Sequence, residues 1–225
     1  MPHLLGLIFD LDGTLVDSAA DLCQALNALL AAHGRRALSI DEVKSLTGDG
    51  LSPMLHRAFA ATGEAMPESA AKTLFDDFLA FYQNQKASPE QLYPHAAETL
   101  RAFRAKGIKT GLCTNKLYQP TMKLLREIGI ADQFDFVAGA DTFDVYKPHP
   151  GHVLGVAKGM KIPPAYCAMI GDSSNDIRAA KGAKVASIAI AHGYGNVDML
   201  GADAMIAGFK ELPDALRSLG FDVVG

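Results

Sequence analysis

The chain has few cysteines and no long apolar run, and it carries no excess of positive charge. Its three cysteines are odd in number and widely spaced along 225 residues, which is typical of reduced thiols and not of a disulfide framework or a zinc site. The first apolar run, residues 4–9, is too short for a signal peptide or a membrane span. Lys and Arg number 21 against 25 Asp and Glu, without a basic tail, which argues against nucleic acid as a partner. These absences favour a globular protein of the cytoplasm that binds neither a membrane nor nucleic acid.

From residue 92 onward, apolar strands alternate with amphipathic helices. Such alternation is typical of a mainly parallel sheet with helices on both faces. The expected strands, including one that opens the chain, are residues 4–9, 108–113, 134–139, 166–170, 185–190 and 204–206. The sequence therefore predicts an α/β fold with a Rossmann-like, doubly wound parallel sheet.

Residues 17–88 differ from the rest of the chain because they contain helical patterns and no convincing strand. Leu22, Leu26, Leu29 and Leu30 follow the i, i+4, i+7, i+8 spacing of one helix face. We expect residues 1–16 and 89–225 to form the sheet-containing core and residues 17–88 to form an inserted all-helical domain. The breaks at residues 13–18 and 87–93 are candidate hinges.

The most informative segment follows the first strand, where Asp10 and Asp12 precede Gly13. In open α/β sheets, ligands bind at the carboxyl ends of the strands. If strand geometry continues, side chains two residues apart share a face, which would place both carboxylates in one site. Two such carboxylates repel each other unless a cation or a shared proton intervenes. An acidic turn without further function is the alternative interpretation of this segment alone.

Three further groups of polar residues also follow predicted strands. Thr114 and Asn115 come after residues 108–113 and are suited either to anion binding or to capping a helix. Lys147 lies in a loop before two prolines and is either a phosphate ligand or an exposed lysine. Asp172 and Asp176 follow the strand at 166–170 and are suited to a metal site, although Asp176 alone could cap a helix. Because the carboxyl ends of parallel strands lie at one edge of a sheet, all four groups are expected to converge.

In this order, the four groups resemble the motifs of the haloacid dehalogenase-like hydrolase superfamily over essentially the whole chain. The matching segments are Asp-Leu-Asp-Gly-Thr at 10–14, Thr-Asn at 114–115, Lys-Pro at 147–148 and Gly-Asp-x-x-x-Asp at 171–176. Within the superfamily, the chain is most similar to bacterial phosphoglycolate phosphatases. That similarity is carried by Leu-Val-Asp-Ser at 15–18, Thr-Gly-Asp-Gly at 47–50, Cys-Thr-Asn-Lys at 113–116 and His-Gly-Tyr-Gly at 192–195.

The resemblance implies a Mg²⁺-dependent phosphomonoester hydrolase that forms an aspartyl-phosphate, with 2-phosphoglycolate as the expected substrate. Asp10 would be the nucleophile, and Asp12 would donate a proton to the leaving group and later accept one from water. Mg²⁺ would be held by the Asp10 carboxylate, the Asp12 backbone carbonyl and Asp172, with Asp176 supporting them.

The same resemblance implies that Thr114, Asn115 and Lys147 bind the phosphoryl group of the substrate. The insertion would be a cap that selects the substrate, with Gly48 and Gly50 in a loop near the leaving group. A plain turn between two helices is the alternative interpretation of that loop. The expected partner is a small phosphorylated metabolite, and the expected assembly is a monomer or a homodimer.

Other functions on the same fold remain as alternatives. A sugar phosphate, a nucleotide or pyrophosphate could replace 2-phosphoglycolate as substrate, because only the cap decides among them. A phosphosugar mutase that resembles this chain would carry a histidine in the first helix of the insertion, and residues 19–24 contain none. A non-enzymatic binding protein would be expected to have lost one of the carboxylates or Lys147, and all are present.

Overall fold

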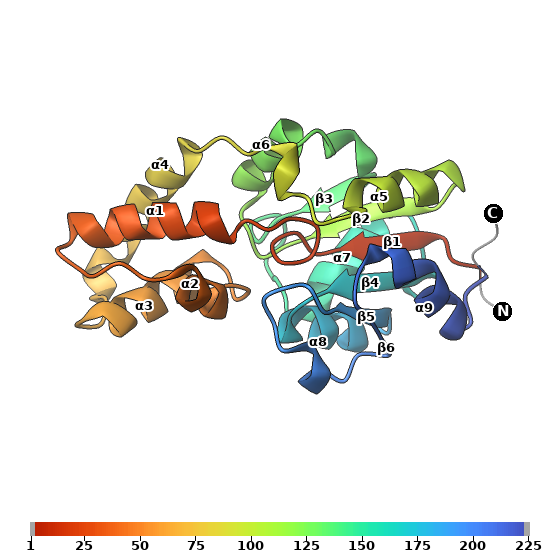
Figure 1. Cartoon of the computed structure of the whole chain (residues 1–225). Helices are drawn as coiled ribbons and strands as arrows, with labels where there is room; N and C mark the ends of the chain where they lie inside the picture. The colour runs from red at the N-terminus through yellow and green to blue at the C-terminus, as the bar shows by residue number, and fades with distance from the viewer. Residues whose placement is uncertain (1–2, 223–225) are drawn as a thin grey trace. The chain divides into compact units, whose positions relative to one another are not determined.

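The computed structural model describes residues 3–222, and the chain divides into two compact units. The core unit comprises Met1–Asp17 and Ser88–Gly225, and the helical unit comprises Ser18–Ala87. In Figure 1 the helical unit runs from red-orange to yellow, after the first strand and before the green and blue segments. The helical unit is thus an insertion in the sequence of the core unit.

Within residues 3–222, the core unit contains a six-stranded sheet in the order β3-β2-β1-β4-β5-β6 (Figure 1). All neighbouring strands are parallel, which confirms the predicted fold class. The strands are β1 (Gly6–Phe9), β2 (Lys109–Cys113), β3 (Phe136–Ala138), β4 (Cys167–Gly171), β5 (Ala186–Ile190) and β6 (Ala204–Ile206).

The central strand β1 determines where the polar segments meet. Phe9, its last residue, is aligned with Leu112 of β2 on one side and with Ile170 of β4 on the other. The segments that follow these three strands therefore leave the sheet side by side, at its carboxyl edge.

Both faces of the sheet are covered, as expected for a buried parallel sheet. Ile8 packs in a cluster with Val153 and Ala180 from two helices, whereas the ring of the next residue, Phe9, lies 6.3 Å from that of Phe209. Successive strand residues point to opposite faces, so the two contacts lie on different sides of the sheet. The helices of the core unit are α5 (Ala96–Ala105), α6 (Tyr118–Glu127), α7 (Pro150–Met160), α8 (Ser174–Gly182) and α9 (Leu212–Ser218).

The helical unit has an apolar core of its own. Its helices are α1 (Ala19–Ala32), α2 (Ile40–Leu46), α3 (Leu51–Thr62) and α4 (Ala71–Gln83). Leu26, Leu30, Leu55, Phe59 and Phe78 are buried together in one cluster. The leucine spacing that predicted an amphipathic helix thus corresponds to the buried face of α1.

The chain segments that leave and re-enter the core unit pair with each other. Val16 and Leu92 form an antiparallel bridge, the Asp17 N–H donates to the Gln91 carbonyl at 2.8 Å, and the Tyr93 N–H donates to the Leu15 carbonyl at 3.0 Å. These hydrogen bonds tie the two segments together beside the loop that follows β1.

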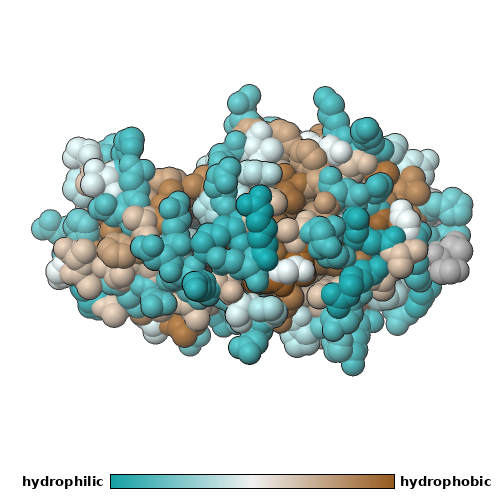
Figure 2. All heavy atoms as spheres, turned by 90° about the horizontal axis from the view of Figure 1, so that it is seen from above, coloured by the Kyte–Doolittle hydropathy of each residue, from teal (hydrophilic) through white to brown (hydrophobic). Residues whose placement is uncertain are grey.

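One face of the molecule is drawn by hydropathy in Figure 2. Hydrophilic side chains lie over most of the face drawn in Figure 2, with apolar atoms visible between them. Met199 and Met205 are among the large apolar side chains that are exposed. No helix within residues 3–222 is both long and apolar enough to cross a lipid bilayer.

Candidate active site

Asp10 directly follows the buried strand β1 at the centre of the sheet. Its N–H donates to the Ile170 carbonyl of β4 at 2.9 Å, and its side chain is buried. Beyond Asp10 the chain leaves the sheet, because the N–H groups of Thr14, Leu15 and Val16 all donate to the Leu11 carbonyl. The expected continuation of strand geometry through Asp12 is therefore wrong, and a tight loop closes there.

Lys147 joins two of the aspartates. Its ammonium donates to Asp10 Oδ1 at 2.7 Å and to Asp176 Oδ1 at 2.6 Å, and its side chain is only 2% exposed. The alternative of an exposed loop lysine is therefore wrong. Burial opposes the charged form of Lys147, but the two aspartates outweigh it and raise the pKa of the ammonium above its usual range. Lys147 thus remains a cation at neutral pH.

Two side chains fix the backbone of Lys147. Its N–H donates to His152 Nδ1 at 3.2 Å, and its carbonyl accepts from Asn115 Nδ2 at 2.8 Å. His152 Nε2 lies 3.2 Å from the Gly139 carbonyl, which assigns the neutral imidazole with its proton on Nε2. Burial, with the nearby Lys147 charge, lowers the pKa of His152 to about 4.

Asp176 lies in the first turn of α8 and is fully buried. Its Oδ2 accepts from the Ser173 N–H at 2.9 Å and from the Ser173 hydroxyl at 2.6 Å, while its Oδ1 binds Lys147. A Cβ at Gly171 would overlap the Asp176 carboxylate, so the bare backbone of Gly171 allows the close approach. Asp176 therefore caps α8, as one of its two interpretations predicts, and it also neutralises Lys147, a contact that the sequence did not predict.

Asp172 follows β4 and is held by two donors. Its Oδ2 accepts from the Tyr194 N–H at 2.7 Å, and its Oδ1 accepts from the Thr14 hydroxyl at 3.2 Å. A Cβ at Gly13 or at Gly193 would overlap the Asp172 side chain. Burial and the neighbouring Asp176 raise the pKa of Asp172 to about 6.

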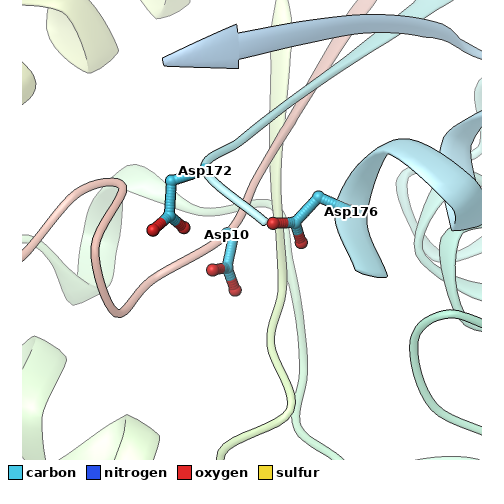
Figure 3. A group of neighbouring side chains, drawn as sticks. All are labelled: Asp10, Asp172 and Asp176. Carbon is cyan, nitrogen blue, oxygen red and sulfur yellow. The ribbon is translucent and has the colours of Figure 1, made fainter. Parts of the chain in front are cut away.

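Asp10, Asp172 and Asp176 converge, as Figure 3 shows. Each offers a carboxylate oxygen, and these oxygens lie within 4.8 Å of one another. The three carboxylates carry more negative charge than Lys147 alone can balance, and burial raises the pKa of both Asp10 and Asp172. A buried oxygen-only donor set with excess negative charge suits a hard divalent cation such as Mg²⁺. The residues present therefore fit a divalent cation.

Thr114 and Asn115 lie at the end of β2, beside these aspartates. The Thr114 N–H donates to the Ala138 carbonyl at 3.0 Å, and its buried hydroxyl accepts from the Lys116 N–H at 3.2 Å. Helix α6 begins only at Tyr118, with Leu117 as its N-cap residue. The capping interpretation of Thr114 and Asn115 is therefore wrong, and Asn115 instead donates to the Lys147 carbonyl.

Asp12 is not part of the group of three aspartates. Both of its carboxylate oxygens lie 3.1 Å from Lys116 Nζ, and the side chains of Lys116 and Asp12 are 9% and 13% exposed. The structure thus separates Asp10, next to the candidate cation site, from Asp12, next to a second lysine.

Sequence reasoning assigned no role to Lys116, His152 or Tyr194. Lys116 and Tyr194 lie within segments that carry the family resemblance, and that resemblance could have pointed to them. His152 lies in no such segment. Their partners are distant in sequence, since Lys116 binds a residue 104 positions away and Tyr194 binds one 22 positions away. Only the assembled sheet edge brings these pairs together.

Gly48 and Gly50 lie in the helical unit, between α2 and α3. Both have positive φ angles, 113° and 93°, a conformation that favours glycine. Arg57 braces this loop, because its guanidinium donates to Asp49 Oδ2 at 2.5 Å and to the Leu46 carbonyl at 2.6 Å. The loop therefore has a defined conformation within its own unit.

Comparison with known proteins gives a consistent result along nearly the whole chain. A family model described as haloacid dehalogenase-like hydrolase matches residues 5–184. The phosphoglycolate phosphatase of Agrobacterium fabrum is 38% identical over 211 residues, which cover 93% of this chain and 91% of that protein. The phosphoglycolate phosphatase of Chromobacterium violaceum is 33% identical over 219 residues, which cover 97% and 99%. A crystal structure of a predicted phosphoglycolate phosphatase from Haemophilus somnus matches with a TM-score of 0.85 and 28% identity, covering 94% of this chain and 97% of that one.

Proposed function

The chain belongs to the haloacid dehalogenase-like hydrolases, and from that premise we propose that it is a Mg²⁺-dependent phosphatase that hydrolyses 2-phosphoglycolate through a phosphoryl-Asp10 intermediate. The observation that carries the proposal is the convergence of three buried aspartates and Lys147 at the carboxyl ends of β1 and β4. The similarity to phosphoglycolate phosphatases over more than nine-tenths of the chain supports the choice of substrate.

Asp10 forms the covalent bond in the first step. Lys147 binds Oδ1 of Asp10 and so orients the carboxylate, and the second oxygen attacks phosphorus opposite the ester oxygen. The phosphorus–ester oxygen bond breaks, and the leaving glycolate oxygen takes a proton from Asp12. In the second step Asp12 accepts a proton from water as the water attacks phosphorus, which releases inorganic phosphate and restores the Asp10 carboxylate.

Mg²⁺, held by the Asp10 carboxylate, the Asp12 backbone carbonyl and Asp172, would neutralise charge between the nucleophile and the anionic substrate. Thr14 and the Tyr194 N–H hold the Asp172 carboxylate in place for that purpose. Asp176 acts behind these ligands, by holding Lys147.

Thr114 and Lys147 contact the oxygens of the transferring phosphoryl group in this proposal. The Thr114 hydroxyl and the N–H groups after β2 offer donors, and Lys147 offers positive charge. The family resemblance also implies that Asn115 binds substrate. Its hydrogen bond to the Lys147 carbonyl favours a different role, in which Asn115 positions Lys147.

The helical unit acts as the cap that selects the substrate, with the loop containing Gly48 and Gly50 as the expected contact to the leaving group. Two glycines with positive φ allow a ligand to approach the backbone closely there. The protein acts in the cytoplasm on a small phosphorylated metabolite, as a monomer or a homodimer.

Phosphate release from 2-phosphoglycolate, with and without Mg²⁺, tests the proposal. Sugar phosphates, mononucleotides and pyrophosphate complete the panel. We expect a clear preference for 2-phosphoglycolate that chelation abolishes and that Asp10→Asn eliminates, while Asp198→Asn, at an exposed position, keeps the wild-type rate. Equal activity across the panel would refute 2-phosphoglycolate as the preferred substrate. A near-normal rate for Asp10→Asn would refute the assignment of Asp10 as the nucleophile.

A further inference from the structure

Lys116 is a second lysine at the carboxyl edge of the sheet, and the proposed reaction steps do not use its ammonium group. Its side chain is only 9% exposed, and its Nζ lies 3.1 Å from both carboxylate oxygens of Asp12. A lysine loses conformational entropy and hydration when it is held in this way. Holding Lys116 beside Asp12, the proposed proton donor, therefore costs free energy.

The backbone of Lys116 is fixed on both sides. Its N–H donates to the Thr114 hydroxyl at 3.2 Å, and its carbonyl accepts from the Ala140 N–H at 2.9 Å. A Cβ at Gly139 would lie 2.8 Å from the Lys116 carbonyl oxygen, so the glycine after β3 lets the two segments meet. The ends of β2 and β3 thus hold the start of the Lys116 side chain in one place.

We propose that Lys116 binds the carboxylate of the substrate. It thereby selects a phosphate ester in which the carboxylate is bonded to the carbon that bears the ester oxygen. The inference rests on the proposed function, in which Asp12 contacts the ester oxygen. In such a substrate, the carboxylate carbon is two bonds from that oxygen. A cation that touches both oxygens of Asp12 is therefore beside the point where the substrate carboxylate must lie.

The other lysine of the site shows that one ammonium can serve two carboxylates. Lys147 donates to Asp10 and to Asp176 at 2.7 and 2.6 Å, as three N–H donors on one nitrogen allow. Lys116 can hold Asp12 and a substrate carboxylate in the same manner. Lys147 is already shared between two aspartates. In this proposal Lys147 binds the phosphoryl group of the substrate, and Lys116 binds its carboxylate.

The test compares two substrates of similar size, 2-phosphoglycolate and 2-hydroxyethyl phosphate, in which a neutral alcohol replaces the carboxylate. We expect Lys116→Met to lower the ratio of their kcat/KM values by roughly 10- to 150-fold, the factor that a hydrogen bond to a charged group contributes. Lys123→Met, which removes an exposed lysine paired with Glu127 on the same segment, is the matched control and should leave the ratio unchanged.

Three other results would overturn either the inference or the proposed substrate. Equal losses for both substrates would mean that Lys116 only positions Asp12, which refutes the inference and leaves the proposed function standing. A wild-type protein that hydrolyses 2-hydroxyethyl phosphate as well as 2-phosphoglycolate would refute the proposed substrate itself. If Lys116→Met is folded but inactive, calorimetric binding of both esters is compared in Asp10→Asn with and without Lys116→Met. An unchanged binding preference for 2-phosphoglycolate there would refute the inference.

Discussion

His152 gives the most quantitative prediction of the structure, because its buried neutral ring holds the loop that carries Lys147. Its Nδ1 accepts from the Lys147 N–H, and its Nε2 faces the Gly139 carbonyl. Protonation would place a second hydrogen opposite the Lys147 N–H and a positive charge beside the Lys147 ammonium. The folded protein therefore resists protonation of His152, and the pKa of the ring falls from 6.5 to about 4.

The sign and size of the effect on stability follow from these two pKa values. Well above pH 6.5 the ring is neutral in both the folded and the unfolded state, so it adds no pH dependence there. As the pH falls from 6.5 towards 4, His152 becomes protonated in the unfolded chain but stays neutral in the folded protein. The free energy of unfolding therefore decreases. Linkage gives a loss of about 2.5 kcal/mol between pH 7.5 and pH 4.5 from this one group.

The assay is urea unfolding of the wild type and of His152→Asn at pH 7.5 and pH 4.5. His152→Asn is expected to be less stable than the wild type at pH 7.5, because it loses one of the two polar contacts. Relative to the wild type, it should regain about 2.5 kcal/mol at pH 4.5. His95→Asn, at an exposed position with a positive φ that asparagine tolerates, is the control and should show no such gain. Parallel pH curves for the wild type and His152→Asn would refute the reasoning.

Two further predictions concern the candidate Mg²⁺ site. Gly193→Ala places a Cβ on the Asp172 side chain and should weaken Mg²⁺ binding at least tenfold by calorimetry, whereas Gly208→Ala, which has open space around it, should not. Equal affinities would show that Asp172 is not a ligand. Mg²⁺ binding should also weaken about tenfold between pH 7.5 and pH 5, because Asp172, with its pKa raised to about 6, must lose its proton to bind. A pH-independent affinity would contradict that assignment.

Much of the fold and of the site geometry follows from local patterns in the sequence. Short apolar runs separated by amphipathic helices predict the parallel sheet, and parallel strands bring their carboxyl ends to one edge. For that reason the sequence alone predicts that Asp10, Lys147, Asp172 and Asp176 lie together. Their roles in catalysis remain predictions.

The rest depends on contacts that no local pattern encodes. The loop after β1 turns around the Leu11 carbonyl, so Asp12 leaves the strand and meets Lys116 instead of the three clustered aspartates. His152 contacts the backbone of Lys147 and Gly139, and the Tyr194 N–H donates to the Asp172 carboxylate, contacts that form only when several strand ends are assembled. Helix capping by Asp176 is predicted by the sequence, whereas its ion pair with Lys147 is not, and only the structure shows that one carboxylate makes both contacts.

The most direct test of the central claim is to look for the phosphoryl group on Asp10. Enzyme, Mg²⁺ and 2-phosphoglycolate are mixed, quenched in acid within one turnover, and digested for peptide mass spectrometry. We expect a phosphoryl group on Asp10 that appears before free phosphate and is absent from Asp10→Asn. Rapid phosphate release without any phosphorylated peptide, or phosphorylation of another residue, would contradict the account.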